Sequence, residues 1–276
     1  MYLLNGESKH TIELSDRGFQ YGDGVFETIE VLNGTPVFLN QHMQRLFKGC
    51  DRLLIPCPDK ELLQKEAFQL AKGSSSAVLK LIITRGSGGR GYRQPDTIQP
   101  TRLFSLHPFP DYPETFSLHG INARFCDIRL GLNPYLAGIK HMNRLEQVMA
   151  RSEWNHSDVQ EGLMMDINGN VVEGTMSNVF LVKRNVLYTP AIELCGVEGI
   201  LREIVIWLAK KQQIKVIEKT MTKEEILSAD ELFVTNSIIG IWPIKKIDQQ
   251  KYDVGLLTQQ LQRLFLAFKQ EEFHDC

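Results

Sequence analysis

Hydrophobic and polar residues alternate along several segments of the chain, and a period of two predicts β-strands. Residues 26–39 (FETIEVLNGTPVFL) alternate on both sides of Asn33-Gly34, a pair that favours the tight turn of a hairpin. Later segments with strand character bounded by turn residues are 77–84, 101–109, 161–167, 178–189, 214–220 and 231–235. The first and second halves of the chain are therefore both expected to contain sheets.

A second set of segments repeats its apolar residues every three or four positions, which indicates amphipathic helices. One such helix is expected after Asn40, which can act as its N-cap. Another opens with a capping box formed by Thr222 and Glu225. The remaining expected helices cover 59–72, 199–213 and 256–270, and a further helical pattern begins where the turn-prone segment 133–138 ends.

Strands and helices interleave along the chain, but many of the strands pair through tight turns. This arrangement predicts an α+β fold and argues against a doubly wound parallel sheet. The segment 107–116 contains three prolines and little periodicity, which is typical of a linker. The sequence thus predicts an N-terminal domain over 1–110, a linker over 111–120 and a C-terminal domain over 121–276.

Composition narrows the classes of function. The net charge of -2 gives no electrostatic case for binding nucleic acid or an anionic membrane surface. No apolar run is long enough to span a bilayer, and the start of the chain lacks the pattern of a secretory signal. The five cysteines form no CxxC pair and the histidines no HExxH motif, so neither a disulfide framework nor a metal site is expected. A reducing, cytoplasmic setting is the simplest expectation.

The segment GSGGRG (86–91) has the G-x-G-x-x-G spacing of a dinucleotide-binding turn. That turn requires a helix directly after it, and the YRQPDTIQP that follows has no helical period, so a dinucleotide fold is rejected. The segment is better interpreted as a mobile loop that offers Arg85, Arg90 and Arg93 to an anionic substrate. Guanidinium groups suit carboxylates, although exposed loop arginines are also common without such a role.

Lys140 stands at the junction of the turn-prone segment and the helical pattern, within AGIKHM. A surface lysine is the ordinary interpretation. A cation is disfavoured at the positive end of a helix, however, and the preceding residues are mostly apolar. Such surroundings lower the pKa of an ammonium group by desolvation, which suits a Schiff-base lysine.

Three later segments suit an anionic, ring-containing ligand. Glu173, in VVEGTMSNVF, is either an exposed turn carboxylate or the partner of a cationic ring nitrogen. Gly199 stands where a helix is expected to begin, so free backbone N–H groups there can hold a phosphate. The segment VTNS (234–237) ends an expected buried strand with two hydroxyl groups and an amide, which also suit phosphate.

These motifs together resemble the fold-type IV pyridoxal-phosphate enzymes, a family of branched-chain aminotransferases, D-amino-acid aminotransferases and aminodeoxychorismate lyases. The resemblance extends over nearly the whole chain, in this order: SDRGFQYGDGVFETIEV, HMQRL, AGIKHMNRL, EGLMMD, VVEGTMSNVFLV, VEGILRE and ELFVTNS. It implies a small N-terminal α/β domain, a larger C-terminal α/β domain and a homodimer.

The resemblance also implies residue roles. Lys140 would form an aldimine with pyridoxal 5'-phosphate and act as the proton-transfer base. Glu173 would pair with the pyridine nitrogen, and Arg45 would contact the cofactor phosphate. The other residues implied in cofactor binding are Asn178, Gly199, Ile200, Leu201, Thr235, Asn236 and Ser237.

Within this family, RGSGGRGY and LAGIKHMNRLEQV are most similar to the aminodeoxychorismate lyases, which convert 4-amino-4-deoxychorismate to 4-aminobenzoate and pyruvate in folate biosynthesis. This similarity implies that Thr28 lies near the cofactor and binds substrate, and that either Thr28 or Lys140 protonates the departing enol. It also implies that Arg90, or else Arg93, binds a substrate carboxylate. Two alternatives remain open at this point. One is a branched-chain or D-amino-acid aminotransferase on the same fold, and the other is a non-catalytic protein that binds nucleotide or phosphate.

Overall fold

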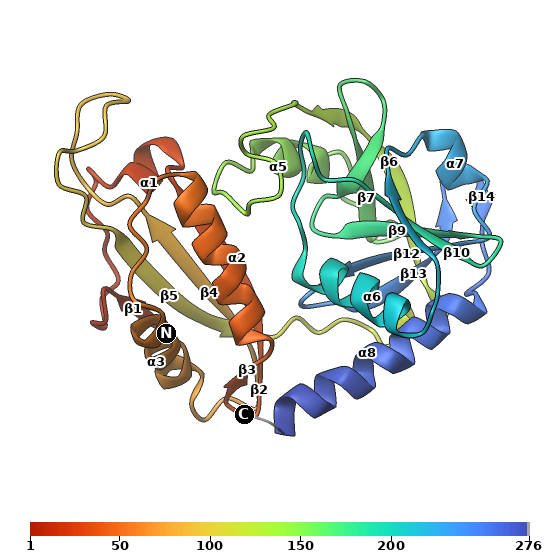
Figure 1. The fold of residues 1–276 in the computed structure, drawn as a ribbon, viewed down its shortest axis with the longest axis horizontal. Helices are drawn as coiled ribbons and strands as arrows, with labels where there is room; N and C mark the ends of the chain where they lie inside the picture. The colour runs from red at the N-terminus through yellow and green to blue at the C-terminus, as the bar shows by residue number, and fades with distance from the viewer. Residues whose placement is uncertain (275–276) are drawn as a thin grey trace. The chain divides into compact units, whose positions relative to one another are not determined.

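The computed structural model describes residues 1–274, which form two compact units (Figure 1). The first unit comprises Met1–Pro110, the short segment Ile139–Asn143 and residues 272–274, and the second comprises Asp111–Gly138 and Arg144–Glu271. Strands and helices occur in both units, so the predicted α+β class is confirmed. Within the described residues, none of the helices has the length and apolar character needed to cross a bilayer.

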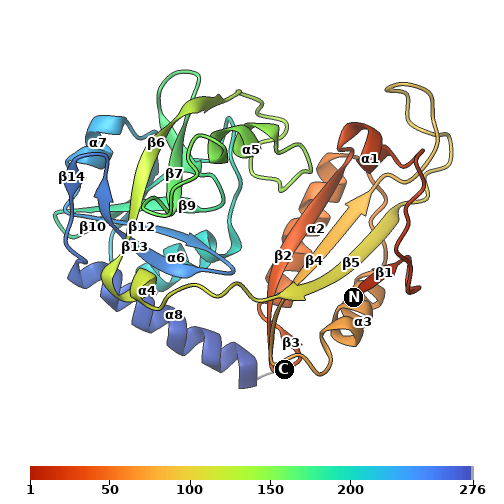
Figure 2. The same ribbon diagram turned by 180° about the vertical axis from the view of Figure 1, so that it is seen from behind.

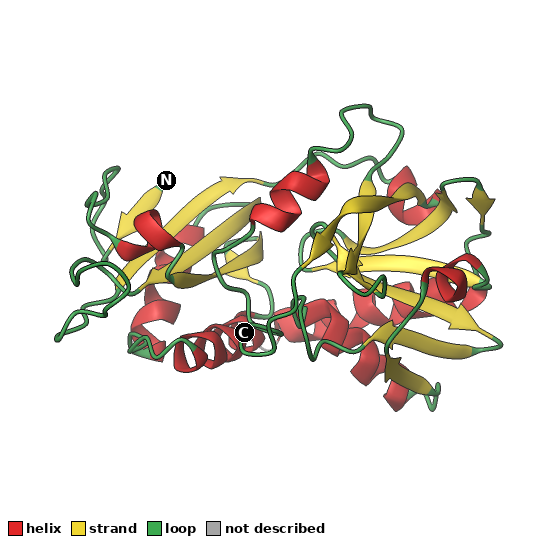
Figure 3. Ribbon diagram, turned by 90° about the horizontal axis from the view of Figure 1, so that it is seen from above, coloured by secondary structure: helices red, strands yellow, loops and turns green. Residues whose placement is uncertain are grey.

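The elements of the first unit are β1 (Tyr2–Leu4), α1 (Arg17–Tyr21), β2 (Gly24–Leu32), β3 (Thr35–Pro36), α2 (Leu39–Arg52), α3 (Lys60–Ala71), β4 (Ser76–Thr84) and β5 (Thr101–Pro108). Its five strands form an antiparallel sheet in the order β1-β5-β4-β2-β3. The two long helices, α2 and α3, both pack on this sheet, because residues of each are buried in one cluster with residues of β2, β4 and β5. Figure 3 distinguishes the strands of the structure, in yellow, from its helices, in red.

The core of the first unit forms where these helices meet the sheet. Val25, Ile29 and Val31 alternate along β2 and are buried in one cluster with Met43 and Leu46 of α2. Because successive strand residues point to opposite faces, the residues between them lie on the other face of the sheet. The two helices therefore cover one face of β2, and the strands are seen from the opposite side in Figure 2.

The expected hairpin is present, with Asn33 and Gly34 at positive φ between β2 and β3. The prediction that Asn40 caps the next helix is wrong, because α2 begins at Leu39 with Phe38 at the N-cap in a left-handed conformation. The Asn40 side chain instead accepts a hydrogen bond from Gln64 of α3 at 3.0 Å. A helix–helix contact has thus replaced the expected local cap.

The elements of the second unit are α4 (Thr115–His119), β6 (Ile121–Leu130), α5 (Leu145–Arg151), β7 (Glu161–Asp166), β8 (Val171–Gly174), β9 (Asn178–Lys183), β10 (Val186–Pro190), α6 (Ile200–Lys211), β11 (Val216–Lys219), α7 (Lys223–Leu227), β12 (Glu231–Asn236), β13 (Gly240–Ile247), β14 (Gln250–Lys251) and α8 (Leu256–His274). Their strands form one sheet in the order β11-β10-β9-β12-β13-β6-β7-β8, with β14 beside β13. The pairings β6–β7, β6–β13 and β10–β11 are parallel and the others are antiparallel. The predicted capping box of Thr222 and Glu225 is present at α7.

Lys140 is not in the first turn of a helix as predicted, because α5 begins five residues later at Leu145. Residues 139–143 are instead outside any helix, and His141 forms a bridge with Val25 at the start of β2. The Lys140 carbonyl accepts from the Phe26 N–H at 2.9 Å, and the Met142 N–H donates to the Gly24 carbonyl at 2.9 Å. Pairing with a distant strand satisfies the backbone groups that a helix would otherwise have used.

Candidate active site

The Lys140 side chain lies on the face of β2 that α2 does not cover. Its Nζ atom is 4.6 Å from the centroid of the Phe26 ring, a cation–π contact. Thr28 is two residues further along β2, so it shares this face with Phe26. Phe26 and Thr28 are half-buried, whereas Val25 and Glu27, which point to the opposite face of β2, are buried. The lysine predicted as a Schiff-base residue and the threonine predicted as a proton donor thus project from the same surface.

A second lysine on this face was missed from the sequence. Lys80 of β4 pairs directly with Thr28 in the sheet register, and its Nζ atom is 5.4 Å from the centroid of the same Phe26 ring. The sequence does mark Lys80 as unusual, because it is the single charged residue within the apolar strand AVLKLIIT. Two amines and a hydroxyl group therefore surround one aromatic ring, a combination suited to an anionic substrate.

A buried ion cluster lies on the opposite face of β2. Glu27 is fully buried and accepts hydrogen bonds from Arg45 Nε at 2.8 Å and from His42 Nδ1 at 2.7 Å. Burial lowers the pKa of His42 below its usual 6.5; Glu27 opposes this effect, while the charges of Arg45 and Lys140 reinforce it. His42 is therefore neutral at pH 7, with its proton on Nδ1. The Glu27 carboxylate holds the Arg45 side chain in place, but no contact tests the predicted role of Arg45 with a phosphate.

Glu27 makes the stability of this unit depend on pH. Burial alone would raise the pKa of Glu27, but Arg45 and His42 lower it from 4.5 to about 2. The stabilising contribution is present above pH 4.5 and is lost as the pH falls toward 2. We expect the Glu27→Gln variant to unfold at lower urea concentration at pH 7, and its deficit to shrink by about 3 kcal/mol by pH 2. A deficit that stays constant between these pH values would contradict the assignment.

In the second unit, the Glu173 carboxylate is buried and fixed in orientation by two donors. The Val197 N–H donates to Oε2 at 2.8 Å, and Gln147 Nε2 donates to Oε1 at 3.3 Å. The negative charge of Glu173 adds to burial in raising the pKa of Cys195 to about 12. A buried carboxylate of this kind can stabilise a cationic ring nitrogen, as the sequence predicted.

The peptide unit at Val197 also forms a hydrogen bond with Asn178, another residue predicted to bind the cofactor. Its carbonyl accepts from Asn178 Nδ2 at 2.8 Å, so the loop 196–199 is connected both to Glu173 and to the start of β9. A Cβ atom at Gly199 would lie 2.0 Å from Asn178 Oδ1, so only glycine fits at this position. The same loop pairs with Gly138, whose N–H donates to the Gly196 carbonyl at 3.0 Å. The chain reaches Lys140 two residues later.

The end of β12 completes a set of donors suited to a phosphate. Thr235 pairs with Asn178 in the sheet register, and its buried Oγ1 atom has no hydrogen-bond partner among the described residues. Helix α6 begins at Ile200 without a side-chain cap at Gly199, and the first N–H groups of a helix lack intrahelical partners. A buried unused hydroxyl group beside an uncapped helix start fits the phosphate of a cofactor.

Asn236 and Ser237 are placed differently from Thr235. The Asn236 side chain accepts from the N–H groups of Ile238 and Ile239 at 2.8 and 2.9 Å and donates to the Met176 carbonyl at 3.0 Å. These contacts shape the turn after β12. Ser237 follows in that turn and is half-buried.

Glu161 is a second buried carboxylate that sequence reasoning missed. It accepts from the backbone and hydroxyl of Thr175 at 3.0 and 2.6 Å and from Ser177 Oγ at 2.7 Å. These contacts hold the turn between β8, which carries Glu173, and β9, which begins with Asn178. Its signal in the sequence was weak, since a glutamate at the start of a strand is usually solvated.

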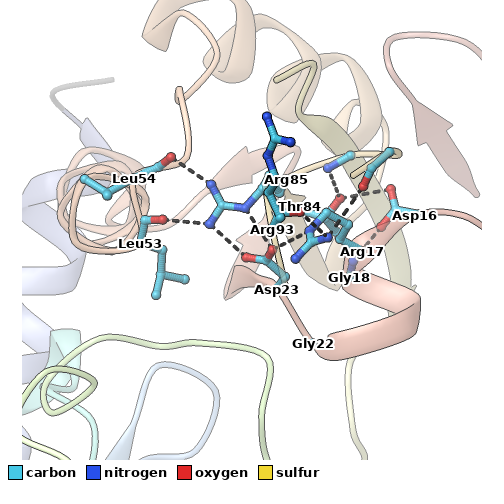
Figure 4. Close-up of polar contacts among 12 residues, drawn as sticks. Asp16, Arg17, Gly18, Gly22, Asp23, Leu53, Leu54, Thr84, Arg85 and Arg93 are labelled. Carbon is cyan, nitrogen blue, oxygen red and sulfur yellow. Dashed lines mark hydrogen bonds and ion pairs between the residues drawn. The ribbon is translucent and has the colours of Figure 1, made fainter. Parts of the chain in front are cut away.

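The three arginines predicted to face the substrate are in different environments. The prediction for Arg85 is wrong, because its side chain is buried and binds Asp23 and the carbonyls of Leu53 and Leu54 (Figure 4). Arg93 is exposed and pairs with Asp96 at 2.7 Å, and Arg90 is exposed. The element that follows this loop is the strand β5, which agrees with the rejection of a dinucleotide fold.

Comparison with known proteins identifies relatives over nearly the full chain. The sequence pattern of the family described as amino-transferase class IV matches residues 24–247. Aminodeoxychorismate lyase from Vibrio harveyi is 34% identical over 266 residues, covering 95% of this chain and 98% of the relative. A putative branched-chain-amino-acid aminotransferase from Methanocaldococcus jannaschii is 33% identical over 273 residues, covering 95% and 94%. The crystal structure of 4-amino-4-deoxychorismate lyase from Pseudomonas aeruginosa has a TM-score of 0.94 at 40% identity, covering 97% and 98%.

The family match and the site geometry agree. The matched residues include Lys140, Glu173, Asn178 and Thr235, where the structure has an amine, a buried carboxylate, a buried amide and a buried hydroxyl group without a partner among the described residues. The chain belongs to the amino-transferase class IV family of pyridoxal-phosphate-dependent enzymes.

Proposed function

We propose that this enzyme is an aminodeoxychorismate lyase, which converts 4-amino-4-deoxychorismate to 4-aminobenzoate and pyruvate. The observation that carries this choice is the likeness to the lyase structure from Pseudomonas aeruginosa, at 40% identity and a TM-score of 0.94, against 26% and 0.86 for the branched-chain aminotransferase structure from Escherichia coli. The open face of β2 supports it, because Lys140, Thr28 and Lys80 there suit a substrate that carries carboxylates and must exchange protons.

Pyridoxal 5'-phosphate supplies an aldehyde and an electron-withdrawing ring that accepts the electron pair of the broken bond. In this proposal the amine of Lys140 holds the aldehyde, and the Glu173 carboxylate keeps the pyridine nitrogen protonated. The phosphate is bound by Thr235, by the backbone at Ile200 and Leu201, and by Arg45. Asn178, Gly199, Asn236 and Ser237 shape the loop and turn around the phosphate donors.

The protein side chains then move the protons. Once the substrate amine has displaced it from the cofactor aldehyde, the Lys140 amine would remove the proton from the amine-bearing ring carbon of the substrate, and the Thr28 hydroxyl would protonate the departing enolpyruvyl group. Lys80, Arg90 and Arg93 bind the substrate carboxylates. Formation of the aromatic product drives the reaction, so no second substrate is required.

A coupled pyruvate assay tests the proposal. The purified holoenzyme is expected to release pyruvate and 4-aminobenzoate in equal amounts from aminodeoxychorismate, with no keto acid present. An aminotransferase would instead stop after one half-reaction until a keto acid is added. Absence of pyruvate release from aminodeoxychorismate without a keto acid would refute the lyase assignment.

The second candidate function is an aminotransferase acting on branched-chain or D-amino acids. The 33% identity to the archaeal aminotransferase over nearly the same length supports this alternative. It requires the same cofactor residues, so only the substrate test distinguishes the two. The same assay run with L-leucine or D-alanine and 2-oxoglutarate measures this activity directly.

Thr235 provides a sharp test of the phosphate site. Because its buried Oγ1 has no partner among the described residues, Thr235→Val should leave the apoprotein at least as stable as wild type. The variant should bind pyridoxal phosphate about tenfold more weakly, since one hydrogen bond to the phosphate is lost. Titration of apoprotein with cofactor, followed by absorbance, measures this change.

Thr189 is the matched control, because it is equally buried in the same sheet but donates to the Val179 carbonyl at 2.9 Å. Thr189→Val should lower the free energy of unfolding by about 1 kcal/mol and leave cofactor affinity unchanged. The assignment fails if Thr235→Val instead destabilises the apoprotein and binds cofactor normally.

The proposal includes a homodimer in the cytoplasm. Leu145, Val148 and Met149 lie at helical spacing on α5 and are all exposed, an apolar strip that a second copy of the chain can cover. Cys50, Cys57, Cys126 and Cys195 are free thiols, which suits a reducing compartment. Light scattering of the protein as it elutes from a size-exclusion column should give a molar mass twice that of the chain.

A further inference from the structure

Two buried arginines share one carboxylate at the start of β2 (Figure 4). Arg85 binds Asp23 through Nε at 2.8 Å and Nη2 at 3.0 Å, and Arg17 binds the same carboxylate through Nε at 2.9 Å. Only 5% of the Arg17 side chain and 4% of the Arg85 side chain is exposed. Since Arg85 alone satisfies both oxygens of Asp23, the second arginine requires another explanation.

The remaining donors of Arg17 point to the glycine-rich loop. Its Nη1 atom lies 3.0 Å from the Gly91 carbonyl, 3.4 Å from that of Arg93 and 3.5 Å from that of Gly88. A single guanidinium nitrogen is thus surrounded by three backbone acceptors of residues 88–93. Such a loop loses much conformational entropy when it is ordered, and charge-assisted hydrogen bonds offset that cost.

Other contacts attach the same loop to helix α1. The Arg17 N–H donates to the Gly86 carbonyl at 2.9 Å, and the rings of Tyr21 and Tyr92 are 5.8 Å apart. A Cβ atom at Gly89 would lie 2.4 Å from the Arg93 carbonyl and 3.2 Å from Arg17 Nη1, so the backbone folds tightly against the guanidinium group. The loop expected to be mobile is therefore closely attached to its own unit.

The turn that carries Asp23 also contacts the segment that carries Lys140. Asn143 Nδ2 donates to the Gly22 carbonyl at 3.1 Å, and the Met142 N–H donates to the Gly24 carbonyl. The glycine-rich loop is thus linked to residues 22–24 through Arg17 and Asp23, and the segment that carries Lys140 contacts the same residues directly. Displacement of the loop would change the position of Arg90 relative to Lys140.

We propose that Arg17 is a positioning residue for substrate recognition, which holds residues 88–93 in the conformation that presents Arg90 to a substrate carboxylate. This inference rests on the proposed function for the identity of the substrate. Arg17 acts through the loop backbone and does not itself contact the substrate. Its replacement should therefore raise the KM and leave the turnover number and cofactor affinity nearly unchanged.

The test uses Arg17→Met in the holoenzyme. Methionine fills a similar length, and Asp23 keeps its two bonds to Arg85, so no buried carboxylate is left unpaired. Trypsin cleaves after Arg90 and Arg93, both of which are exposed, so the cleavage rate in the folded protein reports how firmly the loop is held. We expect cleavage there to rise about tenfold or more, and KM for aminodeoxychorismate to rise by a similar factor with kcat within twofold.

Arg102→Met is the matched control, because Arg102 binds buried Glu66 through three hydrogen bonds in the same sheet, away from the loop. It should lower the thermal stability without changing the rate of cleavage at the loop. Arg17→Lys serves if Arg17→Met does not fold. It keeps the positive charge beside Asp23 but lacks the second guanidinium nitrogen that binds the loop carbonyls, so its cleavage rate should exceed that of wild type.

A double variant separates positioning from general destabilisation. If Arg17 acts through Arg90, the KM of Arg17→Met/Arg90→Ala should equal that of Arg90→Ala alone. Unchanged cleavage in Arg17→Met, or faster cleavage with an unchanged KM, would overturn the inference. A wild-type enzyme that releases no pyruvate would refute the proposed function, while the cleavage comparison would still decide whether Arg17 holds the loop.

Discussion

The Lys140→Ala variant should bind no pyridoxal phosphate covalently and should lose at least about 10⁴-fold in kcat. In the proposed function, Lys140 supplies both the amine that holds the aldehyde and the base that moves the substrate proton, so one substitution would remove two functions. Intact mass after borohydride treatment measures the attachment, because reduction fixes a cofactor bound to a lysine amine. The wild-type chain should gain one reduced cofactor and the variant none.

Lys80 is the matched control for this experiment, because its amine lies near the same Phe26 ring. Lys80→Ala should retain the reduced adduct on Lys140 and should raise the KM, as expected for a residue that binds a substrate carboxylate. An adduct that persists in Lys140→Ala and disappears in Lys80→Ala would show that the two lysines had been assigned the wrong way round.

Glu173→Gln should lower kcat by about 10²–10³-fold with little change in fold. Glutamine keeps the size of the side chain and an oxygen that can accept from the Val197 N–H, but it removes the negative charge that keeps the pyridine nitrogen protonated. The decrease in kcat is measured in the pyruvate assay. The loss of the protonated ring is measured as a change in the near-visible absorbance of the bound cofactor between pH 6 and 9.

Glu146→Gln provides the comparison in the same unit, because Glu146 accepts only from the Gly131 N–H at its surface position. Its kcat should remain within twofold of wild type. If Glu173→Gln also kept its turnover within twofold, the carboxylate would be a structural support of the 196–199 loop and not a partner of the ring nitrogen.

Elements governed by local patterns could be predicted from the sequence. The Asn33-Gly34 hairpin and the capping box at Thr222 depend on neighbouring residues only, and both are present. Helix α3 is also close to its predicted limits, because Asp59 caps it through its own side chain. The resemblance to fold-type IV enzymes then identified the family, since its motifs are spread along the chain in a fixed order.

Features that depend on distant pairing could not be predicted. The helical period after Lys140 was real, but backbone pairing with β2 kept residues 139–143 out of the helix. Arg85 looked like a loop arginine because nothing near it in the sequence indicates that Asp23 is its partner. Lys80 could not be predicted as a site residue, because it lies opposite Thr28 only through the pairing register of β2 and β4.

Glu173 and Asn178 of the second unit were both named from the sequence, but their mutual geometry was not predicted. Glu173 and Asn178 are five positions apart, a spacing that says nothing about a common neighbour. The structure shows that both bind the peptide unit of Val197, one at its N–H and the other at its carbonyl. That relation arises from the fold of the 196–199 loop, which no local pattern encodes.

In the proposed function, the peptide at Val197 would set the distance between the two ends of the cofactor. One rigid amide connects Glu173 on one side to Asn178 on the other, and Asn178 pairs with Thr235 in the sheet. The distance between the group that would meet the ring nitrogen and the hydroxyl that would meet the phosphate is therefore fixed by the backbone. Analogues with a longer phosphate arm should satisfy only one end at a time. The enzyme would thereby discriminate among pyridoxal phosphate analogues by the length of the phosphate arm as well as by its charge.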